Sequence, residues 1–79
     1  MIEFNNNAVG KTIRNIRISK GLSQEVFSGL IGIARSHLSM IETGSKNANF
    51  ETIWRIANAC NMQPSELVHL IEKEALRIR

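Results

Sequence analysis

The stretch from Gln24 to Thr43 constrains the fold of this 79-residue chain more than any other. Its apolar residues recur at helical spacing in two short segments, and Gly32 stands between them. A glycine is expected where a helix ends and the chain turns with a positive φ, because a residue with a Cβ adopts that conformation only at a cost. Two short helices joined in this way form the layout of a helix-turn-helix, whose second helix enters a DNA groove.

Small and capping residues fit the same interpretation. Ser28 and Ala34 leave room where the two helices touch, and Ile33 is expected to fill the corner from inside. Ser23 precedes the first of these helices as an N-cap, with Glu25 well placed against the helix dipole, whereas the second helix lacks such a cap. The apolar positions expected to face the core are Val26, Phe27, Leu30 and Ile31 in the first helix and Leu38 and Ile41 in the second.

Caps and apolar stripes predict three further helices. The asparagines at 5–7 offer caps for a helix that ends near Gly21, Asn49 caps a later helix, and Pro64 suits the first position of the last one. The inward positions are Val9, Ile13 and Ile16 in the first helix of the chain and Ile53, Ile56, Ala57 and Cys60 in the fourth.

These elements predict an all-α fold, a compact five-helix domain built around the helix-turn-helix. The domain is expected to span residues 1–79, with the motif at about 24–43 and with helices at about 50–61 and 64–78 that serve the core and dimerisation. A domain of this length has a small core, so pairing with a second copy would add stability.

Charge and composition favour a polyanionic partner and give no support to catalysis. Residues 1–50 hold six basic and three acidic side chains, whereas residues 51–79 hold four of each. There is no Asp, the two His lie on different predicted helices, and no glycine-rich phosphate loop is present. We therefore expect no enzyme, no cofactor, no metal site and no small-molecule ligand. The lone Cys60, with no bilayer-length apolar segment and no signal peptide, predicts a cytoplasmic protein without membrane contact.

Several short motifs spread from Val9 to about Ile71 carry a family resemblance. They are Arg17, the Leu22–Glu25 run, Gly32, the Leu38–Gly44 run and the helix Ile53–Cys60. Together they resemble the Xre-type family of Cro-like helix-turn-helix regulators, which includes phage repressors and the controller proteins of restriction-modification systems. The short length, the loop at 45–47 and the segment at 71–74 are most similar to controller proteins.

The outer face of the second motif helix carries the residues expected to read bases. In a helix-turn-helix the N-terminal end of that helix enters the major groove. Arg35 is the strongest candidate, because its planar guanidinium matches O6 and N7 of guanine. Ser36, His37, Ser39 and Met40 are the other candidates, with a solvated surface position as the alternative for His37 and the edge of the core as the alternative for Met40.

The resemblance implies two further sets of residues. Arg17 and Glu42 would form a buried ion pair that ties the first helix to the end of the recognition helix. The DNA backbone would be contacted by Gln24, Thr43, Ser45, Lys46 and Asn47, which would fix the register without preferring a base.

The last helix carries more apolar residues than one small core needs. A lone exposed apolar patch would be an aggregation hazard, so we expect a two-fold dimer through this helix and the outer face of the preceding one. Trp54 suits either that interface or the rim of the core. The expected interface residues are Trp54, Leu67, Val68, Leu70 and Ile71, with Ile78 as a further apolar position.

These features predict a sequence-specific DNA-binding transcriptional regulator that binds double-stranded DNA as a homodimer on an inverted-repeat operator. The resemblance further implies a controller protein of a restriction-modification system. A phage-type repressor is an alternative, and so is an antitoxin-like protein-interaction module that binds DNA with a partner. An architectural protein indifferent to sequence is disfavoured by Arg35 and Ser36, because nonspecific binding needs only phosphate contacts.

Overall fold

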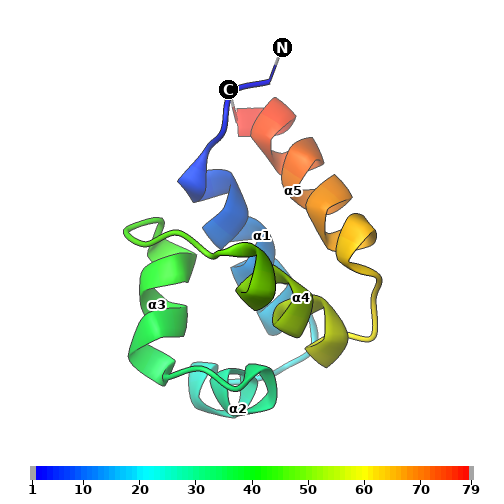
Figure 1. Ribbon diagram of the computed structural model, residues 1–79. Coiled ribbons are helices and arrows are strands. Elements are labelled where there is room, and N and C mark those ends of the chain that lie inside the picture. Colours follow the sequence, from blue (N-terminus) through cyan, green and yellow to red (C-terminus); the bar gives the residue numbers. More distant parts are fainter. Residues whose placement is uncertain (1, 79) are drawn as a thin grey trace.

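The computed structural model describes residues 2–78, and its regular structure is helical throughout (Figure 1). Within these residues there is no strand, so the predicted all-α fold is confirmed. No helix in this part of the chain is both long and apolar enough to cross a bilayer. The helices are α1 (Asn6–Ser19), α2 (Gln24–Ile31), α3 (Arg35–Thr43), α4 (Phe50–Ala59) and α5 (Pro64–Ile78).

Helix α1 runs through the middle of the molecule, with α3 packed on one side and α5 on the other (Figure 1). Helix α2 packs against α3 and α4, and α4 also contacts α5. Every helix contributes at least one large apolar side chain that is completely buried, so the five helices share a single core. These side chains are Ile13 of α1, Phe27 of α2, Leu38 and Ile41 of α3, Ile56 of α4 and Leu67 of α5.

The helix starts follow the predicted caps. The side-chain oxygen of Asn5 accepts a hydrogen bond from the amide of Asn7 at 2.8 Å. The hydroxyl of Ser23 accepts one at 3.1 Å at the start of α2, and the side chain of Asn49 accepts one at 2.8 Å at the start of α4. Each cap satisfies an amide that the first turn of a helix leaves without a partner. Ala34 stands at the same place before α3 and offers no side-chain cap, as predicted.

The backbones of α1 and α3 approach each other closely at Gly10. A Cβ added there would lie 2.6 Å from the carbonyl oxygen of Glu42 and would also collide with the carbonyl oxygen of Ile41. Only glycine fits this crossing, because any side chain would force the two helices apart. The end of α3 is therefore fixed directly against the middle of the molecule.

Two residues that were expected in the core of α2 are exposed. Val26 and Leu30 keep 52% and 59% of their surface, whereas Phe27 and Ile31 are buried. An eight-residue helix with this many apolar residues presents an apolar arc wider than α3 and α4 cover. The prediction that Val26 and Leu30 face the core is therefore wrong. Ala34, expected between α2 and α3, is also exposed.

An arm without regular structure, residues 2–4, precedes α1. It runs beside the last turns of α5, so the two ends of the described chain lie at the same end of the molecule, far from α2 (Figure 1). The arm carries two apolar side chains that are largely open to solvent, Ile2 at 39% and Phe4 at 75%.

Candidate nucleic-acid interface

The turn between α2 and α3 sets the direction of α3. Gly32 ends α2 with φ of 87°, and its amide donates to the carbonyl of Ser28 at 2.8 Å. The guanidinium of Arg55 on α4 donates to the carbonyl of Gly32 at 3.3 Å and to Glu51 at 3.0 Å. Helix α4 thus holds the carbonyl of Gly32 and helps to fix the turn from which α3 departs.

The N-terminus of α3 is open. Ala34 provides no side-chain acceptor, so the amides of the first turn have no capping partner from that residue. Arg35 and Ser36, the first two residues of the helix, are exposed. The positive end of the helix dipole, the open amides and a guanidinium therefore occur together, an arrangement that attracts anionic groups such as phosphates.

The solvent face of α3 carries most of the residues predicted to read bases. Leu38, Ile41 and Glu42 turn inward and are buried. The remaining face holds Arg35, Ser36 and Met40 as exposed residues and Ser39 as a half-buried one, and Thr43 continues it into the last turn. His37 is half-buried and lies beyond Met40, at the border with the core-facing side.

The loop after α3 is folded tightly onto the carbonyl of Met40. That oxygen accepts hydrogen bonds from the amides of Ser45 at 3.0 Å and Lys46 at 3.2 Å. It also accepts from the hydroxyls of Thr43 at 3.1 Å and Ser45 at 3.2 Å. A carbonyl oxygen has two lone pairs for these four donors, so both hydroxyls have an acceptor within the protein that a phosphate oxygen would have to displace. Lys46 and Asn47 are exposed and remain the better placed of the predicted backbone contacts.

A buried ion pair joins the core-facing side of α3 to α1. The Nε of Arg17 lies 2.7 Å from one carboxylate oxygen of Glu42, and its Nη2 lies 3.0 Å from the other. This bidentate contact raises the pKa of Arg17 above its ordinary value, so the guanidinium stays charged. The amide of Gln24 at the start of α2 donates to the same carboxylate at 3.0 Å. Because that nitrogen carries two N–H groups, Gln24 keeps a second donor for a phosphate.

The five residues predicted for the dimer interface do not share one surface. Leu67 is completely buried in the core, so its assignment to an interface is wrong. Trp54 and Val68 are exposed at 54% and 48%. Ile71 lines a groove between α5 and the start of α4, whereas Leu70 lines a separate depression between α5 and α1.

Two features of this region were not predicted from the sequence. The contact of Arg55 with the turn joins positions that are distant in sequence, and only the neighbouring Glu51–Arg55 pair, four residues apart on one helix, was visible as a pattern. Phe50 and the arm carrying Phe4 form the rim of the groove beside Ile71. A signal existed, since both phenylalanines stand at or before a helix start where little of the core is within reach.

This chain matches a protein family and several known proteins. The helix-turn-helix family model HTH_3 matches residues 13–67. The control protein C.BamHI of Bacillus amyloliquefaciens is 35% identical over 60 residues, which cover 75% of this chain and 74% of that protein.

Solved structures agree with these matches. The restriction-modification controller protein C.AhdI of Aeromonas hydrophila superimposes with a TM-score of 0.75 at 35% identity, over 78% of this chain and 94% of that one. The controller protein C.Esp1396I, solved as a tetramer with its natural 35-base-pair operator, superimposes with a TM-score of 0.82 at 26% identity, over 94% of this chain and 97% of that one.

Proposed function

Since this chain belongs to the helix-turn-helix family HTH_3, we propose that it is a sequence-specific DNA-binding regulator of transcription. It binds as a homodimer to an inverted-repeat operator and acts as a controller protein of a restriction-modification system. The family is one of DNA-binding regulators rather than enzymes, and the chain acts by binding, without catalysis.

The observation that carries this proposal is the geometry of α3. The helix stands against α1 through the Gly10 crossing and the Arg17–Glu42 pair, so its outer face is held rigidly. That face presents Arg35 at an open N-terminus, the end that a helix-turn-helix places in the major groove. A guanidinium held there can pair with O6 and N7 of a guanine, and such a pair contributes roughly 1–3 kcal/mol of discrimination.

The two-fold operator and the controller role rest on the relatives. C.BamHI is named as a control protein, and C.Esp1396I and C.AhdI are named as restriction-modification controllers. The C.Esp1396I assembly on its operator contains several copies of a chain with the same fold. Two copies related by a two-fold axis would set their α3 helices in successive major grooves about 34 Å apart, so the half-sites should be inverted repeats about one turn apart.

A titration of duplexes tests the proposal. The probe is the DNA immediately upstream of the chain's own coding sequence, and the competitor is the same duplex with its sequence scrambled. Specific binding by the purified chain alone is expected. Failure to bind without an added protein would favour a module that needs a partner, and equal competition by the scrambled duplex would indicate an architectural protein.

Two substitutions separate base reading from anchoring. Arg35→Ala should lose most of the affinity for the operator and keep much of the weak affinity for scrambled duplex. Lys46→Ala should weaken both about equally and lower the slope of log affinity against log salt by roughly one unit, because it removes one phosphate contact. Equal losses on both duplexes for Arg35→Ala would show that Arg35 contacts the backbone and reads no base.

A further inference from the structure

The two ends of the recognition helix α3 are held in different ways. Its C-terminal end lies against α1 at the Gly10 crossing and is joined to α1 by the Arg17–Glu42 pair. Its N-terminal end begins at Arg35 and follows the turn at residues 32–34. The residue proposed to read a base therefore stands at the opposite end of α3 from these two contacts.

Side-chain caps hold the first turns of α1, α2 and α4, but not that of α3. Asn5, Ser23 and Asn49 each accept a hydrogen bond from an amide of the helix that follows, whereas Ala34 has no side-chain acceptor. A helix start without a cap lacks one of the interactions that hold its first residues in place. The position of Arg35 therefore depends strongly on the turn that precedes it.

Arg55 of α4 contacts this turn from outside the helix-turn-helix. Its Nη1 donates to the carbonyl oxygen of Gly32 at 3.3 Å, and its Nη2 donates to Glu51, one turn earlier on α4, at 3.0 Å. The guanidinium is planar, so the bond to Glu51 orients the nitrogen that reaches Gly32. It also packs over Gly32, since a Cβ added there would lie 3.1 Å from Nη1. Within residues 2–78, no other side chain from outside the motif donates to the backbone of the turn.

This contact lies at the surface of the protein. The side chains of Arg55 and Glu51 are 48% and 72% exposed, and exposed ion pairs add little to the stability of a fold. Loss of the contact should therefore leave the five helices folded. It should allow the turn, and with it the first residues of α3, to move more freely.

We infer that Arg55 is a positioning residue for base reading, which acts through the carbonyl of Gly32 on Arg35 and does not itself touch DNA. This inference rests on the proposed function, because it concerns the orientation of the residue that reads the operator. Recognition of a base edge needs its donors held within about 0.5 Å, whereas attraction to phosphates falls off gradually with distance. A looser turn therefore lowers the preference for the operator more than the affinity for any duplex.

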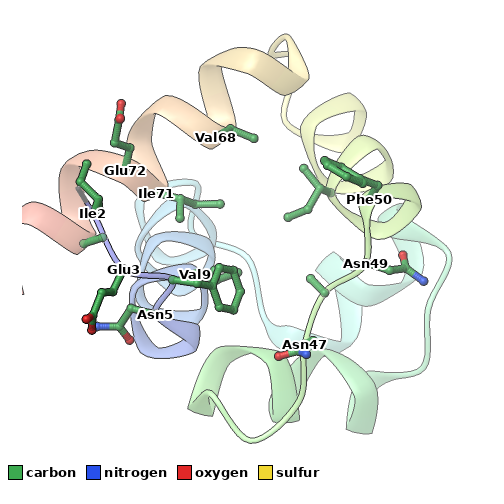
Figure 2. Close-up of a pocket in the computed structure, with 14 residues that line it drawn as sticks. Ile2, Glu3, Asn5, Val9, Asn47, Asn49, Phe50, Val68, Ile71 and Glu72 are labelled. Atoms are coloured by element: carbon green, nitrogen blue, oxygen red, sulfur yellow. The ribbon is translucent and has the colours of Figure 1, made fainter.

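Arg55 lies apart from the apolar groove beside α5. Figure 2 shows Phe50, at the start of α4, across this groove from Val68 and Ile71 of α5. Neither Arg55 nor Glu51 lines the groove, and neither belongs to α5. Substitutions at these two positions should therefore leave the dimer expected through α5 unchanged. Sedimentation equilibrium checks this, so that a change in DNA binding can be assigned to the turn.

Alanine variants test the inference by duplex titration. Arg55→Ala removes the contact, and Glu51→Ala removes the residue that orients it. Arg77→Ala is the matched control, because it removes the same charge from an exposed pair within α5, far from the turn (Figure 1). The quantity measured is the ratio of the affinity for operator to the affinity for scrambled duplex. Arg55→Ala should lower this ratio at least about fivefold, the low end of the discrimination that a bidentate pair with a base provides. Arg77→Ala should leave the ratio unchanged.

The opposite charges of the pair distinguish positioning from a direct phosphate contact. Glu51→Ala removes a negative charge, so it should strengthen binding to scrambled duplex and still lower the ratio, by a smaller factor than Arg55→Ala. A phosphate contact by Arg55 would instead make Arg55→Ala weaken both duplexes equally and lower the salt slope by roughly one unit. That result would overturn the inference, and so would an unchanged ratio for Arg55→Ala.

Amide hydrogen exchange in the free protein tests the turn without DNA. The amides of Gly32 and Ile33 donate to the carbonyl of Ser28 at 2.8 and 3.1 Å, and Gly44 and Ser45 end α3 with comparable bonds. Arg55→Ala should speed exchange at 32–33 and leave 44–45 unchanged, because only the first turn loses a contact. Unchanged exchange at 32–33 would overturn the inference. A wild type without operator preference would refute the proposed function, whereas a specific wild type whose Arg55→Ala variant keeps the ratio would refute only the role of Arg55.

Discussion

Replacing Glu42 with alanine should remove a large share of the stability of the fold. The carboxylate is 2% exposed and accepts three hydrogen bonds, two from Arg17 and one from Gln24. In Glu42→Ala the guanidinium, only 13% exposed, would keep the carbonyl of Leu22 at 2.9 Å as its remaining acceptor, and that oxygen carries no charge. Breaking a buried pair from one side costs about 3–5 kcal/mol, because the remaining charge is uncompensated.

This loss is large on the scale of the whole domain. Domains of this kind are stable by about 5–15 kcal/mol, so the loss is a large share of the total stability. With a urea m-value of roughly 1–2 kcal/mol/M, the midpoint should fall by about 1.5–5 M. Urea titration followed by far-ultraviolet circular dichroism measures the shift, with both proteins at one concentration because dimerisation raises the apparent stability.

A double substitution distinguishes a lost charge partner from lost packing. Arg17→Met with Glu42→Leu removes both charges and keeps most of the volume, so it should recover most of the stability lost in Glu42→Ala. A wild-type midpoint for Glu42→Ala would refute the reasoning, because it would mean that the pair adds nothing. A double variant as unstable as the single one would show that the uncompensated charge was not the cause.

Two further outcomes are expected. Gly10→Ala should lose about 1–3 kcal/mol or more, because its Cβ would meet the carbonyls at the end of α3, whereas Gly29→Ala on α2 has open space and should gain up to about 1 kcal/mol in the same denaturation assay. Burial raises the pKa of the Cys60 thiol, so the folded state keeps its proton to a higher pH than the unfolded chain does. The stability linked to Cys60 is therefore complete below the ordinary thiol pKa of 9.0 and is lost as the pH rises through the raised value. Between pH 9.0 and the raised pKa, the free energy of unfolding should fall less steeply in Cys60→Ala than in the wild type, and equal slopes there would contradict this.

The sequence pattern predicted where the helices begin and end. It did not always predict which of their apolar side chains are buried. Caps and turns depend on local sequence, so helix ends can be predicted without knowledge of the fold. The residues that indicate them are Asn5, Ser23, Gly32 and Asn49. Leu67 was assigned to a dimer although it fills the core. The apolar residues of α5 form a wide band, and periodicity does not say which edge of that band meets α1 and α4.

Some features of the candidate site could likewise be predicted from the sequence, and others could not. The outer face of α3 follows from its own spacing, because Leu38 and Ile41 must turn inward and leave Ser36 and Met40 outside. Arg35 precedes Leu38 by three residues and is exposed because it begins the helix. Contacts between helices could not be derived from spacing, including the bond from Arg55 to Gly32 and the approach at Gly10. Phe50 lies on the apolar side of α4 by periodicity and is nevertheless exposed, because the first turn of α4 stands beside the groove rather than over the core.

The placement of the chain ends has a practical consequence for work with this protein. The arm at residues 2–4 and the last turn of α5 lie at the same end of the molecule, away from α2 (Figure 1). An affinity tag or a fused fluorescent domain at either end would leave the recognition helix unobstructed but would crowd α5, through which the dimer is expected to form. A tagged preparation could then behave as a defective regulator although every DNA-contacting residue is intact. Tags should be cleaved before oligomeric state or operator affinity is measured.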